Sequence, residues 1–167
     1  ILEQMPQRIA REHESGFAVG WSFDKEPPSG PKAAAVKLTV PFSSYKTGYF
    51  TYDADKNQYQ IEQHINSQDV PYVDGATGEG VAVSNVLVLY TDVSSIPGDS
   101  AGRMSVRTTG EGEGLLLRDG QVYEISWQRA DRTVCFSFLD KSGKPVPLAV
   151  GPSYINVVGS GAEVIWE

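Results

Sequence analysis

Hydrophobic and polar positions alternate with a period of two through most of this chain, and this pattern predicts β-strands. Residues 36–40 place valine and leucine on one side and polar residues on the other, which predicts a half-buried strand ended by Pro41. Residues 48–65 predict two strands around an Asp/Asn-rich turn. The run VLVLY (86–90) is apolar throughout and predicts a central strand covered on both faces.

Residues 112–129 predict a β-hairpin, because Asp119-Gly120 separates two strand-like runs and such a turn needs positive φ angles. Alternation assigns one face of the second strand to the core: Tyr123, Ile125 and Trp127. It assigns the opposite face to the outside: Val122, Glu124, Ser126 and Gln128.

The remaining segments complete the expected fold. Residues 1–14 predict a short helix, and the proline-rich stretch 24–32 predicts a surface loop. A strand with Cys135 at its middle is expected over 133–140, and one or two short strands at the C-terminus. The chain is therefore expected to be a mainly β (α+β) domain, an antiparallel, sandwich-like arrangement of sheets with a short N-terminal helix.

Composition narrows the class of protein. The 167 residues, of which 40% are hydrophobic, suffice for one core, so one domain is the default. A net charge of −7 disfavours nucleic acid as a partner. The single cysteine excludes an intrachain disulfide, and no apolar run approaches the roughly 18 residues of a membrane span.

Candidate metal and catalytic patterns are incomplete. The stretch 53–57 begins like a calcium loop, but Gln58 and His64 stand where glycine and glutamate are needed, so a plain turn is preferred. His13, His64 and Cys135 do not have the spacing of a zinc site. No G-x-S-x-G or S-x-x-K motif occurs. We therefore predict no catalytic residue, metal or cofactor in this chain.

Three weaker patterns leave alternatives open. The glycine–glutamate alternation at 110–114 cannot hold phosphate and predicts a flexible turn or bulge leading into a strand at 115. The scattered carboxylates at 69–79 give only non-specific acid–base candidates. Trp21, Trp127 and Trp166 could line a sugar or peptide groove, although core packing is the commoner role of tryptophan.

Residues 48–158 resemble the C-terminal part of the YerB-like lipoproteins of Gram-positive bacteria, a family defined as a domain of unknown function. The resemblance rests on four segments: YDADKNQY, VDGATGEGVAVSNVLVLY, GEGLLLRDGQVYEISW and FLDKSGKPVPLAVGPSYINVV. It implies a larger two-part, exported and lipid-anchored protein. Residues 1–32 would then be a joining helix, strand and Pro-rich loop that follow an N-terminal domain, and 33–167 the C-terminal β-rich domain. Where the family places a basic residue after the tyrosine matching Tyr59, this chain has Gln60 and Ile61.

The absence of a catalytic constellation and the resemblance together favour an extracytoplasmic, non-catalytic binding or interaction module at the cell envelope. We expect its binding surface to include Tyr59, Asp74, Asn85 and Trp127. Expected partners are the protein's own N-terminal domain and a cell-wall peptide or glycan or an envelope protein, but no nucleic acid; the membrane would be reached only through a lipid anchor outside this chain.

Two alternatives remain. The chain could be part of a two-domain cell-envelope enzyme whose catalytic residues lie largely in the N-terminal domain, because sites often form between domains. It could also be a purely structural domain, which would show a large apolar patch where it packs on its other half.

Overall fold

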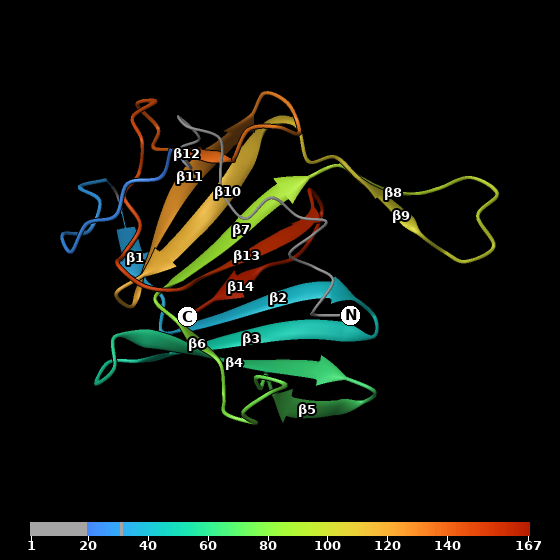
Figure 1. Cartoon of the computed structure of the whole chain (residues 1–167), viewed down its shortest axis with the longest axis horizontal. Helices are drawn as coiled ribbons and strands as arrows, with labels where there is room; N and C mark the ends of the chain where they lie inside the picture. The colour runs from blue at the N-terminus through green and yellow to red at the C-terminus, as the bar shows by residue number, and fades with distance from the viewer. Residues whose placement is uncertain (1–19, 31) are drawn as a thin grey trace, which may run out of the picture.

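A computed structural model describes residues 20–30 and 32–167, and every regular element in those ranges is a strand (Figure 1). The strands are β1 (Lys32–Ala34), β2 (Lys37–Ser43), β3 (Lys46–Asp53), β4 (Gln58–Ile65), β5 (Gln68–Pro71), β6 (Ala82–Val83), β7 (Asn85–Thr91), β8 (Val93–Ser95), β9 (Met104–Val106), β10 (Gly110–Arg118), β11 (Gln121–Arg129), β12 (Ser137–Leu139), β13 (Ser153–Gly159) and β14 (Ile165–Trp166). The mainly β prediction is therefore confirmed for these residues. The helix predicted over residues 1–14 lies outside the described part, and the domain boundary after residue 32 stays a prediction.

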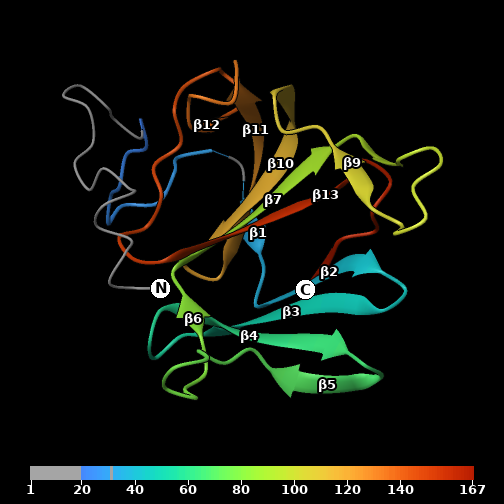
Figure 2. The same cartoon turned by 45° about the vertical axis from the view of Figure 1, so that its right-hand side comes forward.

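Two six-stranded sheets make up the body of the molecule (Figures 1 and 2). The first has the order β1-β11-β10-β7-β13, with β12 also pairing with β11; the second has the order β14-β2-β3-β4-β5, with β6 pairing with β4. The strand ladders are antiparallel except that of β7 and β13, which is parallel. No helix in the described ranges is long and apolar enough to cross a membrane.

The middle of the first sheet is buried on both faces. One face packs against the second sheet through a cluster that includes Val86, Val88 and Leu117. The other face, with Leu87, Leu89 and Leu116, is covered by side chains of loop segments and of β12. These packed residues include Trp21, Phe136, Phe138, Val146 and Leu148. The apolar run 86–90 is thus a central strand with two buried faces, as predicted.

The β10–β11 hairpin forms in the predicted register, with Arg118 opposite Gln121. Asp119 and Gly120 have φ angles of 53° and 68°, so both turn residues occupy the left-handed region that a two-residue hairpin requires. The outward assignment of Val122 is wrong: its side chain is buried against the second sheet. Alternation separates the two faces of a strand, but here both faces are covered.

Three other expectations are corrected. Residues 110–114 are the first half of strand β10 and not a flexible turn. Strand β2 continues past Pro41 and ends at Ser43. Pro41 is paired with Thr47, and the register shifts between Pro41 and Ser43. Cys135 lies in the loop before β12 and not at the middle of a strand.

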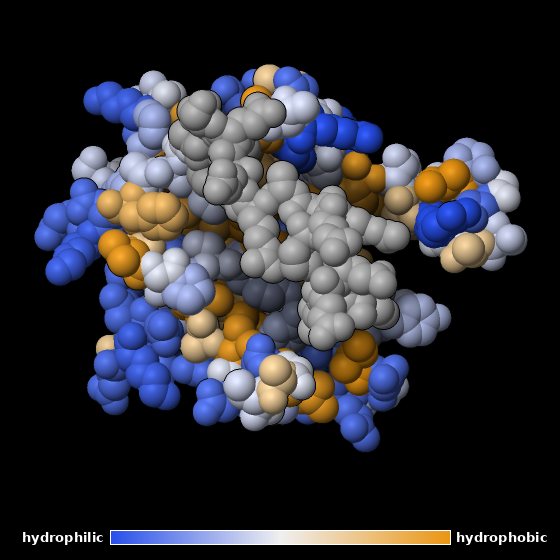
Figure 3. Space-filling view, in the orientation of Figure 1, coloured by the Kyte–Doolittle hydropathy of each residue, from blue (hydrophilic) through white to orange (hydrophobic). Residues whose placement is uncertain are grey.

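A two-stranded ribbon, β8–β9, forms a sheet of its own and projects from the body. Figure 3 shows hydrophobic side chains on this ribbon at the right of the molecule. Its exposed apolar residues are Val93, Ile96, Met104 and Val106.

Candidate functional site: a groove along the edge of β11

Two adjoining cavities form a groove along β11, with volumes of about 710 and 490 Å³. Both are lined by Glu124, Ile125, Asp140 and Lys141, which therefore form the wall between them. We call the larger the carboxylate cavity and the smaller the proline cavity, after the residues described next.

The carboxylate cavity is lined by four acidic residues and two basic ones. It is built by the end of β7, by β10 and β11, by the turn after β12 and by the C-terminal segment. The charged residues are Asp92, Glu113, Glu124, Asp140, Arg107 and Lys141; Tyr90 and Trp166 add aromatic surface. Trp166 keeps 39% of its surface exposed, so its indole is available to a ligand.

The two cations are each engaged by a carboxylate. Arg107 Nε lies 2.7 Å from Asp92 Oδ2, and its guanidinium stands over the Trp127 ring at 5.4 Å from the centroid. Lys141 forms an ion pair with Glu124. The hydrogen bond to Glu124 raises the pKa of Lys141, and the charge of Glu113 adds to this effect. Both cations are thus occupied, and the cavity keeps an excess of carboxylate oxygens.

Ionised carboxylates only accept hydrogen bonds, so the cavity suits a ligand rich in hydroxyl or ammonium donors. Burial, and then the charge of Glu113, raises the pKa of Tyr90, which keeps this phenol a neutral donor and acceptor. A phosphate or a second carboxylate would meet repulsion from the acidic side chains.

The glycine–glutamate alternation of β10 positions Glu113 in the cavity. A Cβ atom at Gly112 would lie 2.6 Å from both Trp127 Nε1 and the Tyr90 carbonyl oxygen. A Cβ atom at Gly114 would lie 2.7 Å from the Val88 carbonyl oxygen. Because successive residues of a strand face opposite sides, the glycines occupy the crowded face and Glu113 the other.

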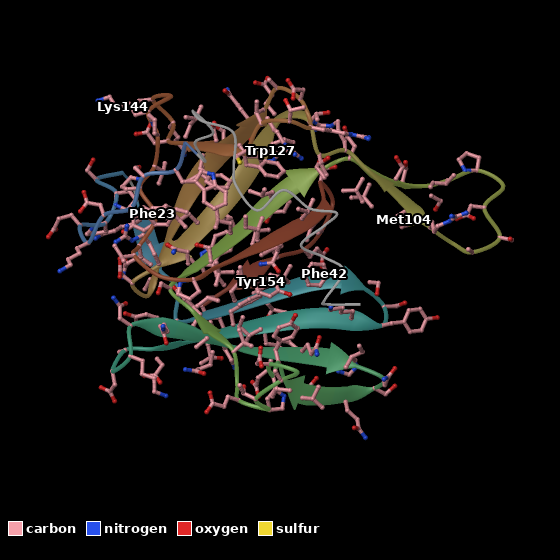
Figure 4. All side chains as sticks on the ribbon, in the orientation of Figure 1. Phe23, Phe42, Met104, Trp127, Lys144 and Tyr154 are labelled. Atoms are coloured by element: carbon pink, nitrogen blue, oxygen red, sulfur yellow. The ribbon has the colours of Figure 1, made fainter. Side chains whose placement is uncertain are left out.

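The proline cavity lies between two loop segments, 24–30 and 140–147, above the middle of β11. Pro27, Pro28, Pro145 and Pro147 make its walls largely apolar. Tyr123 also lines it, and the buried Tyr123 hydroxyl has no hydrogen-bond partner among the described residues. Burial raises the pKa of Tyr123, so this hydroxyl is a neutral donor. Figure 4 places Lys144 at the outer end of the 140–147 segment.

Arg118 holds both walls of the proline cavity to β10. Its side chain is fully buried, and its two terminal nitrogens donate to Pro147 O at 3.2 Å and to Asp24 O and Lys25 O at 3.1 Å each. Its Nε donates to Asp119 Oδ2 at 2.7 Å. Only arginine offers enough donors to reach three carbonyl oxygens and a carboxylate at once. The cavity is therefore formed before any ligand arrives.

Comparison with known proteins identifies the family. The family model described as "Protein of unknown function (DUF3048) C-terminal domain" matches residues 38–155. The chain belongs to this family. The matched span contains β10, β11 and the 140–147 wall of the groove, whereas the 24–30 wall and Trp166 lie outside it.

The YerB protein from Bacillus subtilis has a similar fold, with a TM-score of 0.64 and 21% sequence identity. The similarity covers 87% of this chain and 46% of the YerB chain, so this DUF3048 domain spans less than half the length of that protein. No curated protein matches the chain. The predicted YerB-like family resemblance is confirmed.

None of the four residues predicted to bind lines the groove of this DUF3048 domain. Tyr59 is fully buried, donates its hydroxyl to Ala35 O at 3.2 Å, and has a pKa raised by burial. Asn85 is also fully buried, accepts from Ala149 N–H at 2.7 Å and donates to Ala149 O at 2.9 Å. Asn85 thus satisfies both main-chain groups of Ala149.

Trp127 and Asp74 are the other two residues predicted to bind. Trp127 is buried behind the carboxylate cavity and donates its Nε1–H to Tyr90 O at 3.0 Å (Figure 4). Asp74 is exposed and accepts from the N–H groups of Ala76 and Thr77 at 2.9 Å, which lowers its pKa and fixes the glycine-rich turn. The structure gives all four a structural role, and a ligand role for them stays a prediction.

The calcium-like stretch is a turn. Asp53 Oδ1 accepts from the N–H groups of Asp55 and Lys56, which uses the carboxylate within the turn. In the ranges that the structure describes, no three His, Cys, Asp or Glu side chains gather as a metal site would require.

Proposed function

We propose that this DUF3048 domain is a non-catalytic binding module of a lipid-anchored protein outside the cell membrane, and that its carboxylate cavity binds a glycan of the cell wall. The observation that carries the proposal is the cavity of about 710 Å³, in which carboxylates share the wall with Tyr90 and the exposed indole of Trp166. The placement at the envelope follows from the family resemblance alone.

The chemistry of the cavity fits a sugar better than other envelope ligands. Carboxylate oxygens accept hydrogen bonds from sugar hydroxyls, and an aromatic side chain offers an apolar face to the C–H groups of a sugar ring. A volume of about 710 Å³ lies within the range of ligand sites. The negative excess disfavours teichoic-type polyphosphates and nucleic acid.

A binding role is favoured over glycoside cleavage. Glycosidases need two carboxyl groups free to act as acid and as base or nucleophile across the scissile bond. In this cavity Glu124 is engaged by Lys141 and Asp92 by Arg107. Asp140 accepts from the Ser142 hydroxyl at 2.7 Å and from Lys144 N–H at 3.0 Å. Three of the four carboxylates are thus engaged as acceptors, so Glu113 has no free second carboxyl group to form the pair that cleavage needs.

Thermal unfolding with soluble glycan strands of peptidoglycan tests the proposal. A ligand at a hundred times its dissociation constant adds about 2.7 kcal/mol to the unfolding free energy, which gives a clear rise in Tm. We expect Glu113→Gln, which keeps the shape of the side chain, to lose most of this rise. The matched control Glu79→Gln, in the exposed turn 73–80, is expected to keep it.

Two results would contradict the proposal. An unchanged Tm of the parent chain at saturating glycan would remove the sugar ligand, because a ligand of the folded state must stabilise it. Shortening of the glycan strands during incubation, followed by chromatography, would show that the chain is catalytic.

A further inference from the structure

Glu113 is the carboxylate of the carboxylate cavity that is left for a ligand. Ion pairs or turn hydrogen bonds engage the other three: Asp92, Glu124 and Asp140. Glu113 is exposed, and no ion pair or hydrogen bond joins its side chain to another residue that the structure describes. Four carboxylates against two cations leave the lining with an excess of two negative charges. A ligand that carries a positive charge would therefore be attracted to this cavity.

The cavity already contains one ammonium group beside its glutamates. Glu113 stands opposite Ser126 and Glu124 opposite Leu115, so the two glutamates are diagonal neighbours on one face of the β10–β11 hairpin. Diagonal neighbours lie about 7–8 Å apart, within reach of long side chains. The Lys141 ammonium pairs with Glu124, and after this hydrogen bond the charge of Glu113 also raises the pKa of Lys141. The two carboxylates thus stabilise a primary ammonium group at this place.

An organic ammonium group fits the cavity better than a metal ion. In the part of the chain that the structure describes, no three His, Cys, Asp or Glu side chains gather as a metal site requires. Tyr90 and Trp166 share the lining with Glu113. Burial, and then the charge of Glu113, raises the pKa of Tyr90, so the phenol lies close to this carboxylate. A sugar ring with an ammonium group can pair with the carboxylate, hydrogen-bond to the phenol and pack on the indole.

We propose that the carboxylate cavity selects an amino sugar whose amine is free, as in a glycan of glucosamine units that lack the N-acetyl group. The inference rests on the proposed glycan site and narrows its ligand. The ammonium of the sugar pairs with Glu113, and the sugar hydroxyls donate to the neighbouring carboxylates. N-acetylation turns the ammonium into a neutral amide, which keeps one N–H but loses the charge. Glu113 is thus the residue that determines specificity.

Calorimetric titration of the chain with three tetrasaccharides of the same linkage tests the inference: tetramers of glucosamine, of N-acetylglucosamine and of glucose. The glucose tetramer has a hydroxyl where the others have nitrogen, so it separates the loss of charge from the added acyl group. We expect the glucosamine tetramer to bind about threefold to tenfold more tightly than either of the others, as one partly exposed ion pair allows. Raising the salt concentration should reduce this preference.

Variants assign the preference to its residue. Glu113→Gln keeps the shape of the side chain and is expected to remove the preference. Glu62→Gln, at an exposed glutamate on β4 in the other sheet, is the matched control and should keep it. Lys141→Ala removes the resident ammonium and should increase the preference, because the negative excess grows. Urea unfolding of each variant shows whether the fold is kept.

The outcomes separate this inference from the proposed function. Equal affinity for the glucosamine and N-acetylglucosamine tetramers would overturn the amine preference and leave the glycan site standing. Absence of binding by all three tetramers would overturn both. A tetramer of lysine that binds as tightly as the glucosamine tetramer would also overturn the inference, because charge alone would then explain the affinity. A preference for the glucosamine tetramer without any rise in Tm from peptidoglycan strands would support the inference and remove the cell-wall ligand.

Discussion

Removal of the Arg118 guanidinium is expected to loosen the groove and to destabilise the whole domain. In Arg118→Met the volume of the side chain is largely kept, so the change reports on the lost hydrogen bonds and not on a cavity. Three carbonyl oxygens and Asp119 lose their donor. A hydrogen bond to a charged group contributes about 1.5–3 kcal/mol, and loss of one partner of a buried ion pair costs about 3–5 kcal/mol.

The full sum of these contributions overstates the effect. The Asp119 side chain is 25% exposed, and the freed carbonyls of the loops regain water when the walls separate. We therefore expect a loss of about 3–5 kcal/mol in the free energy of unfolding, measured by urea denaturation, against about 5–15 kcal/mol for a typical domain. Arg118→Lys keeps the positive charge but not the planar set of five donors. Its free energy of unfolding should therefore fall between those of the parent and of Arg118→Met.

Hydrogen exchange provides the local readout. The N–H groups of Asp24 and Leu148 bond to Leu148 O and Ser22 O across the two loop segments. If Arg118 holds these segments, both amides exchange faster in Arg118→Met than in the parent by more than the global loss explains. Arg132→Ala, at an exposed arginine, is the control and should change neither stability nor exchange. A loss below about 1 kcal/mol with unchanged protection of both amides would refute the cross-linking role.

Three further changes are expected to be measurable. Gly112→Ala should lower the free energy of unfolding by about 1–3 kcal/mol, because its Cβ meets Trp127 and Tyr90, whereas Gly80→Ala, with nothing within 4 Å, should leave it unchanged in the same urea titration. Asn85→Ala should cost about 2–4 kcal/mol by calorimetry, since the buried N–H and C=O of Ala149 lose their partner. Acid should destabilise the chain below about pH 4. Hydrogen bonds lower the pKa of Asp74 and Asp140, and Arg103 lowers the pKa of Asp99 to about 2. The stabilisation by these three carboxylates is present above the unfolded-state pKa and is lost as the pH falls through the folded-state pKa. Asp99→Asn should flatten this acid limb, and an unchanged limb would contradict the assignment.

The sequence predicted the elements whose conformation is set locally. The Asp119-Gly120 turn was predictable because its two positive φ angles restrict the residue types. The central position of residues 86–90 was predictable because this run has no polar face. Val122 was misassigned because alternation reports two faces but not whether each is covered. At Gly112 and Gly114 the constraint is the approach of Trp127 and of the β7 main chain, which is not local in sequence.

The groove could not be predicted for the same physical reason. Its walls come from residues 24–30, 140–147 and the C-terminal strand, and the side chain that joins two of them is a buried arginine. In the sequence, Arg118 is one of several arginines scattered along the chain. Its role depends on carbonyl groups that the fold brings to it from 29 and 94 residues away. Of the four residues selected from the sequence, Asp74 serves a local turn, whereas Tyr59, Asn85 and Trp127 bond to carbonyl groups 24, 64 and 37 residues away.

The same geometry explains why the two cavities lie side by side. The turn after β12 places Lys141 against Glu124, and both residues line both cavities. A glycan strand long enough to span both cavities would have to pass this ion pair. Lys141→Ala should therefore increase the affinity for a long glycan strand more than the affinity for a short one. Equal changes for the two ligands in calorimetric titration would show that the cavities act independently.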